Sequence, residues 1–108
     1  MKQRKLPRRE YASYIRSEAW QETRKRYRQS KLPKHCFCCE TNSVPLDLHH
    51  MTYKTLGHEN LNHLTYVCRE CHNEIHERFN NERGTLWTAT KATRKKHQRK
   101  LKNNTVRS

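Results

Sequence analysis

Apolar residues are scarce in this 108-residue chain. Only 31% of the residues are hydrophobic, no more than are charged, which is too little apolar material for a large core. A chain of this length also rarely divides into two independent cores. No stretch approaches the roughly 18 consecutive apolar residues of a membrane span, and residues 1–7 lack the apolar run of a secretory signal. These absences predict one small cytoplasmic domain without membrane partners, held together by something besides hydrophobic burial.

Acidic residues are also few, and their distribution divides the chain into three segments. Residues 1–34 contain twelve Lys or Arg against three acidic residues, residues 35–83 contain four against seven, and residues 84–108 contain eight against none. The net charges are +9, −3 and +8. We therefore expect a basic N-terminal arm, a central core with all five cysteines and seven of the eight histidines, and a basic C-terminal tail.

The two basic segments indicate a polyanionic partner. Lys and Arg side chains release condensed counterions from phosphates, so nucleic acid is the predicted partner, with double-stranded DNA as the first expectation. Trp20, Tyr14 and Tyr27 lie among the basic residues of the first segment. The candidate DNA contacts are Arg24, Lys25, Arg28, Lys95 and Lys96.

Local signals predict helices on both sides of the core. Residues 9–16 have a helical pattern, and Ser17 is a good N-cap for a second helix that ends near Gln29. Residues 44–50 and 61–68 are strand-like, and residues 73–81 predict a short helix ended by Gly84. Residues 91–102 suggest a basic helix, and residues 103–108 suggest disorder.

The cysteines form the strongest motif in the chain. Cys36-Phe-Cys-Cys39 and Cys68-Arg-Glu-Cys71 are two C-x2-C pairs separated by 28 residues. In a reducing compartment such pairs more often bind a metal than form disulfides, and four thiolates suit the tetrahedral site of structural Zn²⁺. Cys38 would then be a spare thiol, and adjacent His35 is an alternative ligand in place of one cysteine.

The histidines are too numerous for one structural zinc site. His72 and His76 are four residues apart, so on a helix both rings project from one face about one turn apart. This is a spacing of metal ligands, although ordinary exposed helix faces also have it. His49 lies on the strand-like run that would pair with residues 61–68. The three histidines together predict a second metal site.

Residues 48–76 resemble the core of the HNH endonucleases; they read L-H-H-M-T-Y-K-T-L-G-H-E-N-L-N-H-L-T-Y-V-C-R-E-C-H-N-E-I-H. The preceding Y-I-R-S-E-A-W and C-F-C-C are similar to the N-terminal helix and first zinc knuckle of small members often found in phage genomes. The resemblance covers residues 11–79. It implies an α+β fold in which a ββα-metal finger, a hairpin followed by a helix, is stapled by the four-cysteine zinc site.

The resemblance also implies roles for the histidines. The ligands of a catalytic divalent metal would be His49, His72 and His76, and the ion could be Mg²⁺, Mn²⁺, Ni²⁺ or Zn²⁺. His50 would be the general base that activates water, since an imidazole with an ordinary pKa of about 6.5 accepts protons near neutral pH. Adjacent residues on a strand point to opposite faces, so we predict that the strand ends or bulges at His50.

The central position of the motif, often Asn in the family, is His63 in this chain. We expect His63 to brace the loop that carries the base, with Asn62 as the alternative. Tyr53, Gly57 and Glu59 match a pattern common in the small members, and we expect them only to shape the connection between the strands.

The sequence therefore predicts a metal-dependent endonuclease that hydrolyses phosphodiester bonds in DNA. A non-catalytic, zinc-stabilised nucleic-acid-binding module is the competing hypothesis, and RNA is the alternative substrate. If the chain is phage-encoded, phage packaging proteins are candidate partners and the host-cell cytoplasm is the expected location. The sequence leaves open the choice among restriction, packaging and homing, the cleavage site, the number of strands cut and the oligomeric state.

Overall fold

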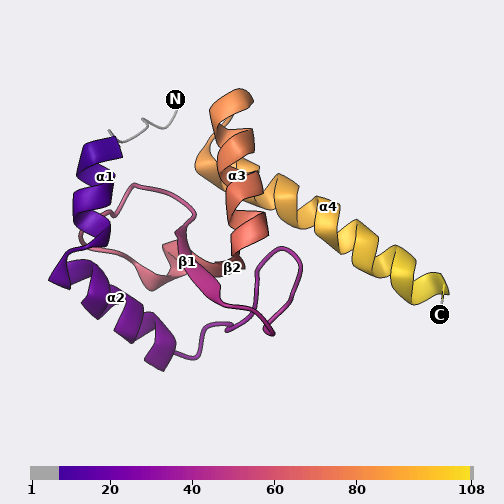
Figure 1. Ribbon diagram of the computed structural model, residues 1–108, viewed down its shortest axis with the longest axis horizontal. Helices are drawn as coiled ribbons and strands as arrows, with labels where there is room; N and C mark the ends of the chain where they lie inside the picture. The colour runs from indigo at the N-terminus through magenta and orange to yellow at the C-terminus, as the bar shows by residue number, and fades with distance from the viewer. Residues whose placement is uncertain (1–7, 108) are drawn as a thin grey trace.

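The structure is a computed structural model that describes residues 8–107 and, within them, the side chains of residues 12–101. Residues 1–7 of the predicted N-terminal arm and Ser108 lie outside the described residues. The described chain is α+β, with one two-stranded antiparallel sheet and four α-helices (Figure 1). The elements in chain order are α1 (Arg8–Ile15), α2 (Glu18–Gln29), β1 (Leu46–His50), the 3-10 turn η1 (Leu61–His63), β2 (Leu64–Cys68), α3 (Arg69–Asn81) and α4 (Leu86–Arg107).

Helices α1 and α2 lie on one side of the sheet (Figure 1). The side chain of Ser17, the predicted N-cap, accepts a hydrogen bond from the Trp20 backbone N–H at 3.2 Å, which satisfies one of the free amides of the first turn. Trp20 and Tyr27 are buried and pack with Leu48 and Leu64 of the two strands. This apolar contact fixes α2 beside β1.

The two strands pair in antiparallel register, with His50 opposite Leu64. Side chains alternate between the two faces of a strand, so successive residues of β1 contact different helices. Leu48 and His50 contact the Trp20 side of the molecule, whereas Asp47 and His49 contact α3. Strand β1 ends at His50, as the sequence predicted.

Helix α3 follows β2 directly. It begins at Arg69, four residues before the start suggested by the sequence, so Cys71 and His72 both lie in its first turn. Cys68 is the N-cap residue and has the extended backbone usual at a helix start, with φ −73° and ψ 163°. Glu70 lies in the first turn, where an acidic side chain interacts favourably with the helix dipole.

Helix α4 stands where the sequence suggested a tail. It contains residues 91–102, for which a basic helix was expected, but it begins at Leu86 and continues through residues 103–107, for which disorder was expected. Leu86 and Ala89 belong to the buried cluster that also contains the cysteines, and Thr90 and Thr93 are fully buried. The many Lys and Arg residues of this segment gave no indication in the sequence that these few residues are buried. The segment expected as a C-terminal tail thus includes a helix that packs onto α3. Within the described residues no helix is long and apolar enough to cross a membrane.

Gly84 lies in the turn between α3 and α4. Helix α3 already ends at Asn81, so Gly84 shapes the entry into α4 and does not end α3 as expected. Its φ of +122° is a conformation that side-chain-bearing residues rarely adopt, and a Cβ atom there would lie 2.5 Å from the Thr88 hydroxyl oxygen. The turn therefore requires glycine.

Candidate metal centres

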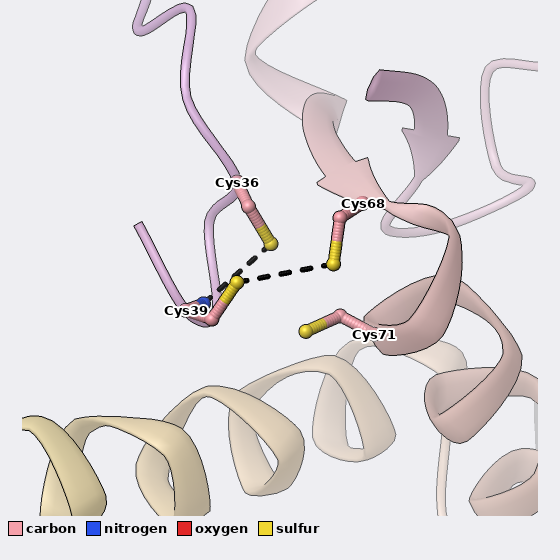
Figure 2. A group of neighbouring side chains, drawn as sticks. All are labelled: Cys36, Cys39, Cys68 and Cys71. Carbon is pink, nitrogen blue, oxygen red and sulfur yellow. Dashed lines mark hydrogen bonds between the residues drawn. The ribbon is translucent and has the colours of Figure 1, made fainter. Parts of the chain in front are cut away.

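Four cysteines converge beside the start of α3 (Figure 2). Cys36 and Cys39 come from the loop before β1, Cys68 ends β2, and Cys71 lies in the first turn of α3. Their Sγ atoms all lie within 4.8 Å of one another, and those of Cys39 and Cys68 are 3.8 Å apart. None of the four forms a disulfide. The group could hold a metal ion such as zinc, for which four thiolates form a closed structural site.

The surroundings of these thiols shift their pKa values in opposite directions. A hydrogen bond with the Cys38 thiol lowers the pKa of Cys36 to about 3. Burial raises the pKa of Cys39 and of Cys71, because an isolated buried thiolate is poorly solvated. A divalent cation reverses this preference, since it replaces the protons and neutralises the thiolates.

Cys38 and His35 lie close to these ligands in sequence but outside the cluster. Cys38 is fully buried, and its Sγ atom lies 4.0 Å from the Thr90 carbonyl oxygen of α4. Its hydrogen bond with Cys36 and its burial raise the pKa of the Cys38 thiol, which keeps that thiol neutral. His35 is exposed. The geometry leaves Cys38 as the spare thiol and gives His35 no place among the four ligands.

Three histidines form a second cluster between β1 and α3. His49, His72 and His76 each offer a ring nitrogen, and these nitrogens lie within 4.8 Å of one another. The ring centroids of His72 and His76 are 4.8 Å apart, and the His49 ring lies 5.1 and 5.6 Å from them. The rings meet at interplanar angles of 66° to 90°, so they converge edge to face and do not stack.

Thr90 of α4 orients the His49 ring, a contact that the sequence did not predict. His49 is 1% exposed, and its Nε2 atom is 2.9 Å from the Thr90 hydroxyl oxygen. That hydroxyl donates its proton to the Leu86 carbonyl oxygen at 2.8 Å, so it accepts from His49 and Nε2 carries the ring proton. The lone pair of His49 therefore lies on Nδ1, a buried atom without a hydrogen-bond partner among the described residues.

Asp47 of β1 orients His72 in the same manner and was not predicted either. The Nδ1–H of His72 donates to the Asp47 carboxylate at 3.1 Å, and Asp47 also pairs with Arg69 at 2.9 Å. A carboxylate accepts hydrogen bonds only, so the lone pair of neutral His72 lies on Nε2. This atom, too, is buried and has no partner within the described part of the chain. Histidine ligands of metals commonly have one ring nitrogen held by a carboxylate or another acceptor while the other binds the ion.

These nitrogens fit a cation site in their protonation as well as in their position. Burial lowers the pKa of His49 well below its ordinary value, and the nearby His72 and His76 add to the effect. Burial and His72 lower the pKa of His76 to about 4. Rings that stay neutral near pH 7 are the form that binds metals, and imidazole ligands suit transition-metal ions. The residues present therefore fit a divalent transition-metal ion.

His50 faces the other side of β1. Its ring is 2% exposed and stacks on Trp20, with the ring centroids 4.7 Å apart. Its Nε2 atom lies 3.2 Å from the Glu59 carboxylate. Burial lowers the pKa of His50, and the hydrogen bond to Glu59 acts in the opposite direction. A positive charge on His72 would lower the pKa of His50 further.

Glu59 is the polar centre of this side of the sheet. Its side chain is 1% exposed and accepts hydrogen bonds from the Tyr14 hydroxyl at 2.5 Å, the Gly57 N–H at 3.2 Å and the Thr23 hydroxyl at 3.4 Å. Burial alone would raise the pKa of Glu59, but the hydrogen bonds, first that of Tyr14, lower it and keep the carboxylate ionised. The expectation that Glu59 only shapes the strand connection was incomplete, because Glu59 contacts His50 directly.

His63 contacts the segment that follows β1 through both its backbone and its ring. Its carbonyl oxygen accepts a hydrogen bond from the Met51 N–H at 2.8 Å, directly after His50. Its Nδ1 atom is 3.1 Å from the Thr55 hydroxyl oxygen. Asn62 is exposed, and its backbone N–H donates to the side-chain oxygen of Asn60 at 2.9 Å. The expectation that His63, and not Asn62, braces the base stays a prediction; the His63 ring reaches Thr55 and not His50.

The predicted DNA contacts lie on two different helices. Arg24 and Arg28 of α2 line a groove beside β1, whereas Lys25 is exposed on the same helix outside that groove. Lys95 and Lys96 are exposed on α4, and Lys96 pairs with a glutamate of α3 at 3.2 Å. The α2 pair Arg24 and Arg28 lines the same groove as His72, a member of the histidine cluster.

The fold thus gathers the predicted metal ligands into two clusters and places the predicted DNA contacts on two surfaces. Comparison with protein-family models, with curated proteins and with solved structures found no match for this chain. The chemistry of these side chains and of their surroundings is therefore the basis for a function.

Replacing Cys71 tests the cysteine cluster. We expect Cys71→Ser to lose zinc and unfold, because a structural zinc site supplies about 10–16 kcal/mol and a domain is stable by only about 5–15 kcal/mol. Cys38→Ser changes a thiol buried to the same degree outside the cluster, and should keep one zinc ion and the fold. Metal analysis and circular dichroism distinguish the two. Loss of zinc from Cys38→Ser alone would contradict the ligand set.

Replacing Thr90 tests the histidine cluster. Thr90→Val keeps the shape of the side chain but removes the acceptor for His49 Nε2–H, and should weaken binding of Mn²⁺ or Ni²⁺ to the zinc-loaded protein by about 10–100-fold. Thr93→Val is the matched control, since Thr93 is equally buried on α4 but its hydroxyl donates to the Ala89 carbonyl oxygen of its own helix. Isothermal titration measures the affinities. Equal affinity of both variants and the unchanged protein would show that Thr90 does not orient a ligand.

Proposed function

We propose that this protein is an HNH-type endonuclease, a metal-dependent enzyme that hydrolyses phosphodiester bonds in DNA. The observation that carries the proposal is the histidine cluster: one ring nitrogen from each of His49, His72 and His76 lies within 4.8 Å of the others, and His49 Nδ1 and His72 Nε2 are buried without a hydrogen-bond partner among the described residues. The order β1, β2, α3 supports the proposal of a ββα-metal finger, and so does the cysteine cluster, which could hold a stapling zinc ion. A binding module alone has no use for a second cation site.

The chain would hold the catalytic ion with His49, His72 and His76. Bound there, a divalent ion would act as a Lewis acid that stabilises the charge on the phosphate and on the leaving 3′-oxygen. Neutral imidazoles favour transition metals over Mg²⁺, so Mn²⁺, Ni²⁺ and Zn²⁺ are better candidates than Mg²⁺. Thr90 and Asp47 would keep the lone pairs of two ligands directed at the ion.

His50 is the proposed general base. Ionised Glu59 accepts hydrogen bonds only, so it holds the proton of neutral His50 on Nε2 and leaves Nδ1 as the basic nitrogen. A ring held in this form is prepared to take a proton from water. Because His50 is 2% exposed, movement of residues 51–60 to uncover it is part of the proposal. His63, which contacts this segment, is the proposed positioning residue.

The charge of the chain supports nucleic acid as the substrate. The net charge of +14 favours binding to phosphates, and we propose double-stranded DNA as the substrate. If the chain is phage-encoded, the host-cell cytoplasm is the proposed location and phage packaging proteins are candidate partners. The burial of His50 favours the alternative of a zinc-stabilised nucleic-acid-binding module without catalysis. The two functions differ in whether DNA is cut.

A plasmid-nicking assay tests the activity. We expect the zinc-loaded protein to nick supercoiled plasmid with at least one of Mn²⁺, Ni²⁺, Zn²⁺ or Mg²⁺, and His50→Ala to slow nicking by about 10²–10⁴-fold, the usual contribution of a general base. His58→Ala is the control, since His58 is exposed in the same segment. DNA binding without nicking under every metal, or equal nicking by His50→Ala, would support the binding module instead. A parallel assay on RNA tests the alternative substrate.

Glu59→Gln tests the orientation of the base. The amide keeps the shape of Glu59 but can also donate a hydrogen bond, so it no longer fixes the proton of His50 on Nε2. We expect kcat to fall by part of the about 10²–10⁴-fold that the base supplies, with KM and affinity for the divalent metal unchanged. Glu22→Gln, an exposed change on α2, should leave all three unchanged. A fall in metal affinity or folding stability that accounts for the lost activity would assign Glu59 a structural role only.

A further inference from the structure

A groove lies between α2, β1 and the start of α3, which we call the α2 groove. It encloses about 760 Å³, and its basic lining residues are Arg24, Arg28, Lys34 and Arg69, with Asp47 as the single acidic one. Asp47 pairs with Arg69 at 2.9 Å, which leaves the three cations of α2 and the following loop without a negative counterpart among the residues that line the groove. The α2 groove therefore favours an anion.

The α2 groove also reaches the histidine cluster. His72 lines it together with Asp47, the carboxylate that holds the ring of His72 at 3.1 Å. A chain of anions lying along α2 would thus pass beside His72. Two other hollows, beside α3 and α4, are lined neither by a ligand of the histidine cluster nor by a basic residue of α2.

The helical spacing explains which cations of α2 enter the groove. Arg24 and Arg28 are four residues apart and project from one face, with buried Trp20 one turn before them. Lys25 lies outside the groove, and Arg26 reaches the other way to donate to the Glu59 carbonyl oxygen at 3.2 Å. Within the described residues neither Arg24 nor Arg28 forms an ion pair, so both charges stay available.

We propose that the α2 groove binds the sugar-phosphate backbone of a DNA strand and leads that strand to His72. The inference rests on the proposed function and adds the path of the substrate: α2, not α4, positions the strand that is cut. Arg24 and Arg28 follow one another along α2, as phosphates follow one another along a DNA strand. Each guanidinium group can bind phosphate oxygens with two parallel hydrogen bonds. Such contacts position the strand without reading its sequence.

The salt dependence of DNA binding tests this path. The full zinc-loaded chain is titrated with a fluorescent DNA duplex, without added divalent metal, at salt concentrations from about 50 to 200 mM, where each lost phosphate contact reduces the slope of log K against log salt by about 0.9. Arg24→Gln with Arg28→Gln should therefore reduce the slope by about 1.8. Lys25→Gln with Lys31→Gln removes the same charge from exposed positions outside the groove and should change it by less than about half as much.

The outcomes are distinct. A larger loss of slope in the arginine pair than in the lysine pair, with folding and zinc content unchanged, supports the path even if the protein cuts nothing, in which case only the proposed function fails. Equal slopes for the two double variants would overturn the proposed path, because the groove arginines would then contribute no more to DNA binding than the exposed lysines. Metal-dependent nicking at the normal rate by the arginine pair also overturns it while leaving the proposed function intact.

Discussion

The arrangement of this chain depends on the cross-link that four cysteines offer between the loop before β1 and the junction of β2 with α3. Two small groups of buried residues flank this junction, and with 31% hydrophobic residues the chain has little more to bury. A bound zinc ion would supply about 10–16 kcal/mol, as much as the whole net stability of an ordinary domain. With zinc bound, the position of α3 would therefore depend on the metal more than on apolar packing.

That dependence extends to the histidine cluster because the two clusters share one helix turn. Cys71 and His72 are neighbours in the first turn of α3, and His76 follows one turn later. An ion that fixes Cys71 thus also fixes the direction from which two histidine rings approach His49. The two candidate sites differ in chemistry, since one offers soft thiolates and the other neutral imidazoles. Both, however, depend on the position of the same turn of α3.

The sequence predicted the contacts that follow from local spacing and missed those that cross the chain. The C-x2-C pairs and the His72 and His76 spacing follow from the geometry of knuckles and helices, and the fold brings each set together. Thr90, Asp47 and Glu59 contact histidines 41, 25 and 9 residues away, and no periodicity marks a polar residue whose partner is on another element. Composition also misled at α4, where frequent Lys and Arg concealed the few buried residues that dock the helix.

Because of the hydrogen bond between His49 and Thr90, the residues that the candidate metal site needs extend beyond the segment that contains its ligands. Every candidate histidine and cysteine ligand lies at or before residue 76, yet the acceptor that fixes the tautomer of His49 comes from α4. If only the segment that contains the ligands were moved into another scaffold, all the ligands would be present. Without Thr90, however, the His49 ring could turn its N–H toward the ion. The candidate metal site therefore needs both its ligands and the Thr90 hydroxyl. The shortest segment that could keep the site extends to the residue that fixes the His49 proton, and not only to the last ligand.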